Sequence, residues 1–309
     1  MYIEKKKIGS KSYFYLKESE RKNGKVKTKT IAYLGKSPMN KKELKKKIET
    51  IKEKTNEKFL TKKQLEELEK IKKNFASKIK KLDVKLVEDM FKDFKTHYIY
   101  NTTAIEGNTL TLGETNLLLN ENKTPEGKDL KEIYDHINEK ETFDWLMRTK
   151  PKLNLNLIIN VHSKLLKNID NRTGIRTHNV RVFGATFETS DAKYIRIDLE
   201  LLMNWYKDNK NKLNTLILSA VFHEKFERIH PFYDGNGRTG RMISNLILLN
   251  SNFPPLIIKN KTRLKYYQSL SKGHESNLTE TDIQKHKAIV LFFYKQIIDT
   301  HKEIFAKWG

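Results

Sequence analysis

The residues best suited to chemistry lie close together in one short segment, IHPFYDGNGRTGR, which begins at Ile229. His230 stands directly before a proline, which cannot donate a helical N–H, so we expect the histidine at the end of a helix. Gly235 and Gly237 allow the backbone between them to turn its N–H groups toward an anion. A helix that begins directly afterwards would present its positive end to the same anion. The segment therefore predicts a phosphate-binding loop with a histidine beside it.

The charged side chains of this segment indicate which phosphate compound it binds. Arg238 and Arg241 are three residues apart and share one face of the following helix, where two guanidinium groups suit a polyphosphate chain. Asp234 offers one carboxylate, which is enough for Mg²⁺ when phosphates and water complete its shell. The pattern lacks the G-x-x-x-x-G-K-[ST] phosphate loop, and no second histidine follows His223 at the zinc-protease spacing. We therefore expect a magnesium nucleotide, with His230 as a general base at neutral pH.

The run from His230 to Arg241 resembles the Fic-domain signature H-x-F-x-D/E-G-N-G-R-x-x-R and matches it at every specified position. The resemblance extends over about residues 84–293. It implies a protein adenylyltransferase that moves AMP from ATP to a Ser, Thr or Tyr hydroxyl of a target protein. By this resemblance His230 deprotonates the hydroxyl, Asp234 holds Mg²⁺ and Phe232 anchors the loop in the core. The implied phosphate-binding residues are Gly235, Asn236, Gly237 and Arg238, with Arg241 on the terminal phosphate.

A second segment, NTTAIEGNTLTL, resembles the inhibitory motif S/T-x-x-x-E-G/N of that family. Thr102 and Glu106 are four residues apart and share a helical face, and Gly107 is a natural helix stop. The resemblance implies that Glu106 pairs with Arg241 and forces ATP into an unproductive pose. The inhibitory helix is expected near residues 86–107, ahead of the catalytic core, as in class II members.

The segment from Asn179 to Thr189 is predicted to form a short β-hairpin, because β-branched and aromatic residues flank Gly184. It falls where the family has a flap that aligns a target strand by β-augmentation, with Val182, Phe183 and Gly184 as its central residues. The proline pair common after that flap is replaced here by ETSD, so the preference for a target is left open. A surface strand without a partner is the alternative interpretation.

The predicted fold is mainly α: a Fic-type helical bundle with a short β-hairpin flap, preceded by a small N-terminal β-hairpin and a helical module. Residues 1–38 form the hairpin module, with strands at 11–16 and 25–34 around an Asn-Gly turn. Apolar residues spaced three and four apart predict basic amphipathic helices over 39–83 and further helices through the catalytic region, 84–309.

Charge and composition add two alternatives and several exclusions. The net charge is +23, of which residues 1–90 carry +15, so a nucleic-acid-binding regulator is one alternative. The coding bias of an AT-rich genome is an alternative explanation of the richness in Lys and Asn. A docking or dimerisation role for the hairpin is the simpler interpretation. With no cysteine, a disulfide framework and a thiol nucleophile are excluded.

Several expectations concern reaction, partners and location. The same site could remove AMP if Glu106 orients a water, whereas phosphate transfer is disfavoured because related phosphotransferring toxins carry Lys where this chain has Gly237. A homodimer and self-modification are expected from the resemblance. No apolar run approaches the roughly 18 residues of a membrane span, and the first residues lack a signal peptide, so we expect a cytoplasmic protein without a membrane partner.

Overall fold

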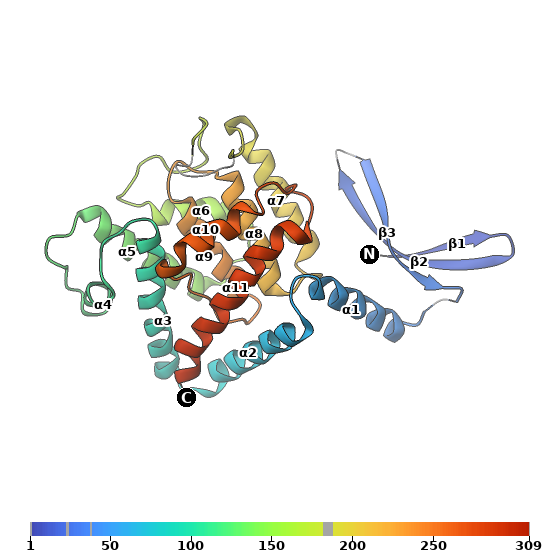
Figure 1. Cartoon of the computed structure of the whole chain (residues 1–309), viewed down its shortest axis with the longest axis horizontal. Helices are drawn as coiled ribbons and strands as arrows, with labels where there is room; N and C mark the ends of the chain where they lie inside the picture. Colours follow the sequence, from blue (N-terminus) through green and yellow to red (C-terminus); the bar gives the residue numbers. More distant parts are fainter. Residues whose placement is uncertain (1, 23–24, 38, 182–187, 309) are drawn as a thin grey trace. The chain divides into compact units, whose positions relative to one another are not determined.

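The computed structural model describes residues 2–22, 25–37, 39–181 and 188–308 (Figure 1). Helices make up most of the described elements, and a single small sheet lies at the start of the chain, which confirms the predicted mainly α fold. The chain divides into two compact units, Met1–Lys54 and Thr55–Gly309. Among the described residues, no helix has the length and apolar character needed to cross a membrane.

The first unit is built on a three-stranded antiparallel sheet in the order β1-β2-β3. Its strands are β1 (Tyr2–Ile8), β2 (Lys11–Lys22) and β3 (Lys25–Gly35), and helix α1 (Lys41–Glu57) follows. The sequence predicted only the hairpin of β2 and β3. It missed β1, YIEKKKI, because its run of lysines has low strand propensity, and pairing along β2 supplies what propensity does not.

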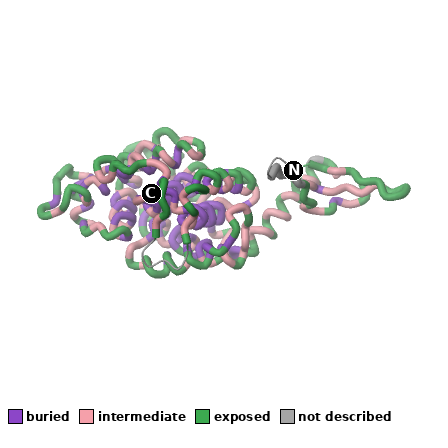
Figure 2. Tube along the Cα trace, turned by 90° about the horizontal axis from the view of Figure 1, so that it is seen from above, coloured by how far each residue is buried: buried purple, intermediate pink, exposed green. Residues whose placement is uncertain are grey.

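The second unit is a helical bundle, and Figure 2 shows its buried residues gathered along the inner faces of these helices. The helices are α2 (Lys62–Lys81), α3 (Val84–Ile105), α4 (Leu112–Glu121), α5 (Leu130–Thr149), α6 (Leu155–Leu165), α7 (Ile195–Asn209), α8 (Thr215–Ile229), α9 (Asn236–Leu249), α10 (Arg263–Ser271) and α11 (Ile283–Glu303). The apolar spacing in the sequence predicted helices over this part of the chain.

Helices α8 and α9 form the centre of this bundle (Figure 1). Nearly every residue of both helices is buried, as expected of helices that are surrounded by neighbours on all sides. Helix α8 packs against α7, α9 and α11, while α9 also packs against α3 and α6. The loop that joins them, residues 230–235, is therefore held between two rigid elements.

Helix α3 carries the segment that resembles the inhibitory motif. Asp83 caps its start by accepting the Leu86 N–H at 2.9 Å. Gly107 ends it with φ +98°, a conformation that favours glycine, and its N–H bonds to the Ala104 carbonyl at 3.1 Å. Glu106 is the C-cap residue, so its side chain leaves the helix at the very end.

Candidate active site

His230 lies at the end of α8, where its N–H still donates to the Phe226 carbonyl at 3.0 Å while its own φ is +50°. The proline at 231 prevents the helix from continuing. Burial lowers the pKa of His230 to about 4, and the positive charge of Arg176 acts in the same direction. The imidazole is thus neutral at physiological pH and able to accept a proton.

The loop after His230 is fixed by the side chain of Asn236. Its Oδ1 accepts the Phe232 N–H and its Nδ2 donates to the Phe232 carbonyl, both at 2.9 Å. The Phe232 ring is fully buried and stacks on His162 from α6, with ring centroids 3.7 Å apart. Because the Asn236 side chain is occupied in this way, its backbone N–H, at the first turn of α9, is the group left for a phosphate.

His162 was not predicted from the sequence. Its Nε2–H donates to the Asp234 carbonyl at 3.0 Å, and burial lowers its pKa to about 4, which keeps the ring neutral. Asp234 itself remains 45% exposed and accepts the Gly235 N–H at 2.6 Å. One carboxylate oxygen of Asp234 therefore still faces the solvent side of the loop.

Two glycines of the loop are required for different reasons. Gly235 has φ +73°, and a Cβ there would lie 2.5 Å from the Leu166 side chain. At Gly237 a Cβ would collide with the carboxylate of Glu106. The first glycine allows the turn, and the second allows Glu106 to lie directly over the start of α9.

Arg238 is buried and forms an ion pair with Asp135 of α5. Its second, longer contact reaches Asp234, with Nη2 and Oδ2 3.7 Å apart. Asp135 is held in turn by the Asn108 side chain, whose Nδ2 lies 3.2 Å from Oδ2. The Arg238–Asp135 pair thus orients one cation of the loop, and Asp135 was not predicted from the sequence.

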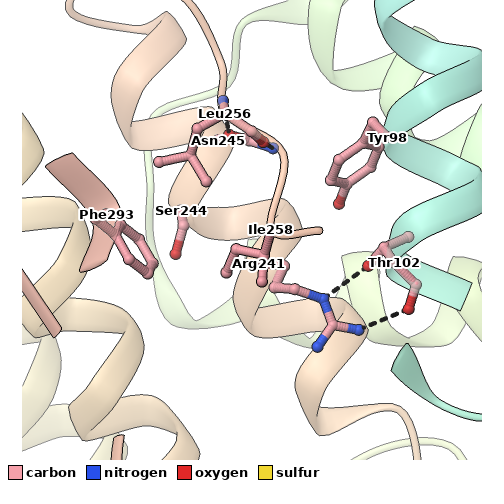
Figure 3. A pocket seen from close by; sticks show the side chains of 8 residues that line it. All are labelled: Tyr98, Thr102, Arg241, Ser244, Asn245, Leu256, Ile258 and Phe293. Carbon is pink, nitrogen blue, oxygen red and sulfur yellow. Dashed lines mark hydrogen bonds between the residues drawn. The ribbon is translucent and has the colours of Figure 1, made fainter. Parts of the chain in front are cut away.

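Arg241 is held by the end of α3 and is only 3% exposed. Its Nε donates to Thr102 Oγ1 at 2.7 Å and its Nη2 to the Thr102 carbonyl at 3.0 Å, the two bonds drawn in Figure 3. Nη2 also donates to Glu106 Oε1 at 2.7 Å. Behind the guanidinium lies a cavity of about 10 Å³, lined by Tyr98 and Ser244 among others, with room for about one water. The structure therefore places Thr102 and Glu106 in contact with Arg241.

Two further carboxyl groups lie close to these arginines. Glu139 of α5 and Glu227 of α8 are buried, and burial raises the pKa of each to about 8. The positive charge of Arg241 opposes that rise in both cases. At neutral pH both groups are mostly protonated, so they do not neutralise Arg241 as Glu106 does.

The predicted flap is described only at its ends. Val182, Phe183 and Gly184 lie outside the described residues. At the described ends, Asn179 Oδ1 accepts the Ala192 N–H at 2.7 Å, so this segment is attached to the protein body by side-chain bonds.

Comparisons with protein families give two matches. A model described as "Fic/DOC family" matches residues 152–248, and one described as "IS1634 family transposase, N-terminal domain" matches residues 3–81. A curated relative, protein adenylyltransferase fic-1 of Caenorhabditis elegans, is 33% identical over 187 residues, which are 59% of this chain and 36% of the relative. Protein adenylyltransferase Fic of Drosophila grimshawi is 29% identical over 189 residues, 59% of this chain and 38% of that protein. The chain thus spans little more than a third of the length of these relatives.

Solved structures support the same assignment of the fold. Fic-1 from Caenorhabditis elegans matches with a TM-score of 0.67 and 26% identity, covering 88% of this chain and 78% of that one. A Fic-domain-containing signaling protein from Bacteroides thetaiotaomicron matches with a TM-score of 0.69 and 22% identity, covering 76% of this chain and 94% of that one. At that identity the second match shows a shared fold.

Proposed function

We propose, from the premise that residues 152–248 of this chain are a domain of the Fic/DOC family, that the protein is an adenylyltransferase that modifies proteins. It transfers AMP from ATP to a Ser, Thr or Tyr hydroxyl of a target, which includes its own chain. The observation that carries the proposal is a neutral His230 beside the first turn of α9 and two buried arginines, Arg238 and Arg241. A base and an anion-binding loop in one place are what nucleotidyl transfer to a hydroxyl requires.

In this mechanism His230 accepts the proton of the attacking hydroxyl. The hydroxyl oxygen forms a bond to the α-phosphorus, the bond from that phosphorus to the bridging oxygen breaks, and pyrophosphate leaves with the bonding electrons. The N–H groups at the start of α9 and the guanidinium of Arg238 stabilise the charge on the phosphates. Such positioning and charge stabilisation supply most of the catalysis in reactions of this class.

The residues present fit a Mg²⁺ ion that arrives with the nucleotide. Asp234 is partly exposed, and one of its oxygens is used by the Gly235 N–H. Among the described residues, no group of three His, Asp or Glu side chains is placed to hold a metal ion by protein ligands alone. One carboxylate with phosphate and water ligands is the usual arrangement for Mg²⁺, which would neutralise phosphate charge when bound. Asp234 is therefore the proposed protein ligand.

Inhibition by Glu106 is part of this proposal. The bond between Glu106 and Arg241 occupies the guanidinium that the terminal phosphate would need. In addition, the carboxylate lies where a side chain at Gly237 would stand, directly above the first turn of α9. ATP can reach its productive position only when Glu106 moves away, or it binds in another pose. The same carboxylate is placed to orient a water for AMP removal, the alternative direction of the reaction.

Labelled ATP tests the reaction directly. Protein is incubated with Mg²⁺ and ATP labelled at either the α- or the γ-phosphate, alone and in cell lysate. The chains compared are the unaltered protein, Glu106→Gly, and Glu106→Gly combined with His230→Ala. We expect α-label in protein, more of it for Glu106→Gly, and none when His230 is also replaced. Transfer of the γ-label alone would replace this proposal by phosphorylation, and no transfer of either label would leave AMP removal as the reaction to assay.

A second function, nucleic-acid binding through the first ninety residues, is favoured by the match of residues 3–81 to a transposase N-terminal domain. These residues also hold most of the excess positive charge. On the described sheet, Tyr2 and Tyr33 are 44% and 47% exposed, and Tyr33 contacts the Tyr15 ring at 5.4 Å. Exposed aromatic rings among lysines suit stacking on bases.

Fluorescence anisotropy with labelled single- and double-stranded oligonucleotides tests this second function on the full chain. We expect affinity that weakens steeply between roughly 50 and 200 mM salt. Tyr33→Ala should weaken binding, and His230→Ala is the control that should not. An affinity that does not depend on salt concentration, or that is unchanged by Tyr33→Ala, would rule out this surface as the nucleic-acid-binding site.

Two expectations from the sequence complete the proposal. A homodimer is expected from the resemblance to the family, and light scattering on the purified chain measures the mass that decides it. A cytoplasmic location is expected from composition, and fractionation of the source cells tests it.

A further inference from the structure

Arg176 is a buried side chain whose role the reaction described so far does not explain. It is 1% exposed. Its Nε donates to the His230 carbonyl at 2.8 Å, and its Nη1 donates to the His178 carbonyl at 2.8 Å. Its Nη2 donates to the Ser190 carbonyl at 2.5 Å and lies 3.2 Å from Thr189 Oγ1. One guanidinium thus bonds the catalytic histidine and the residues on both sides of the segment expected to contact the target.

The backbone of Arg176 strengthens the connection to the histidine. Its N–H donates to the Pro231 carbonyl at 2.9 Å, so two consecutive carbonyl groups after α8 bond to this one residue. His230 has left the helical conformation, with φ +50°, and its carbonyl no longer lies along the helix axis. The orientation of the peptide that carries the imidazole therefore depends on Arg176.

The chemistry of the contacts indicates why an arginine stands here. The groups that contact its guanidinium are carbonyl and hydroxyl oxygens, which are neutral. Burying a cation among neutral acceptors is costly, and an apolar side chain would fill the same volume at lower cost. What only arginine offers is a rigid planar fork with donors pointing in several fixed directions. The position uses that fork to join three separate stretches of backbone.

We propose that Arg176 is a positioning residue that couples residue 178 and residues 189–190, on the two sides of that segment, to the orientation of His230. The inference rests on the proposed function, since it assigns a role in the same transfer. A displacement at either end of the segment is passed to the His230 carbonyl through one rigid group. These four Arg176 side-chain bonds reach neither Arg238 nor Arg241, so we expect ATP binding not to depend on Arg176.

The test compares Arg176→Lys and Arg176→Gln in the Glu106→Gly background. The matched control is Arg172→Lys in the same loop, where the arginine is 65% exposed and pairs with Asp170. Four quantities are measured: the rate constant of self-labelling at saturating ATP, the Kd for ATP, the thermal midpoint, and the pKa of the His230 ring by NMR. The NMR signal that is absent from the His230→Ala variant is assigned to the His230 ring.

We expect both Arg176 variants to label themselves roughly ten- to a hundredfold more slowly, as small misplacements of a reacting group do. Their Kd for ATP stays within about twofold of the parent, because the ATP site is intact. The lysine variant is also slow, since a single ammonium cannot replace the fork. Arg172→Lys leaves all four quantities unchanged.

The inference is overturned if both variants keep the parental rate within about threefold, or if they lose ATP binding and thermal stability together with the rate. If Glu106→Gly transfers label neither to itself nor to proteins in cell lysate, the proposed function fails, and the NMR measurement still decides the role of Arg176. Removal of the cation in Arg176→Gln should then raise the pKa of His230, because Arg176 lowers it in the intact protein. An unchanged ring signal would show that the two residues are not coupled.

Discussion

Replacement of Glu106 by glycine should activate the enzyme, and the structure sets the size of the effect. Glu106 Oε1 lies 2.7 Å from Nη2 of the buried Arg241, while the carboxylate is itself 38% exposed. A hydrogen bond between charged groups contributes about 1.5–3 kcal/mol, and partial exposure favours the lower half of that range. Taking about 2 kcal/mol, and about 1.4 kcal/mol for each factor of ten, the terminal phosphate gains roughly a thirtyfold advantage at Arg241.

The assay is the initial rate of α-label incorporation at an ATP concentration below saturation. Glu106→Gln retains a weaker, uncharged bond to Arg241 and should give an intermediate rate. Glu121→Gly removes an exposed glutamate from the end of α4, where it pairs with Lys123, and should leave the rate unchanged. A rise of less than about threefold for Glu106→Gly, or an equal rise for Glu121→Gly, would refute the assignment of Glu106 as the inhibitory residue.

Three further predictions concern the loop and the base. Asn236→Ala leaves the buried N–H and carbonyl of Phe232 without their hydrogen-bond partners, so the unfolding free energy measured by calorimetry should fall by about 2–4 kcal/mol. A loss below about 0.5 kcal/mol would contradict these two bonds. In Gly235→Ala the new Cβ would collide with a neighbouring side chain at a backbone φ of +73°, so the affinity for ATP, measured by titration, should fall at least tenfold. The control is Gly127→Ala, where φ is +70° but the surrounding space is open, and its affinity should be unchanged. The pKa of His230 is lowered to about 4, so the labelling rate of Glu106→Gly should be constant from about pH 8 to 6 and fall only as the pH approaches that pKa. A decline in rate centred near pH 7 would exclude His230 as the titrating base.

The sequence predicted those parts of the site that depend on local geometry. The helix end at His230 and the stop at Gly107 follow from backbone rules that operate within a few residues. Most helices likewise follow from their apolar spacing. The helix expected directly after the glycine turn is α9, which begins at Asn236 and includes Arg238 and Arg241.

The groups that the sequence did not reveal are those that become functional through packing. Asp135 lies in α5 among other charged residues, and only the packing of the bundle brings it to Arg238. His162 lies on an apolar face of α6, where a histidine is usually only part of the core. Its stacking on Phe232 becomes visible only in the folded structure. Their chemistry arises from contacts over 103 and 72 residues of chain, which no local pattern encodes.

In the proposed regulation, inhibition and activation are exchanges of anions around one buried cation, Arg241. Arg241 is 3% exposed, so removing its partner without replacement would leave a buried charge uncompensated, which costs several kcal/mol. A terminal phosphate that displaces Glu106 supplies the missing negative charge at once. The free-energy cost of this exchange is therefore much lower than that of moving Glu106 away with no anion in its place. In the proposed mechanism, release of Glu106 is therefore coupled to the arrival of a phosphate, so that Arg241 keeps a negative partner.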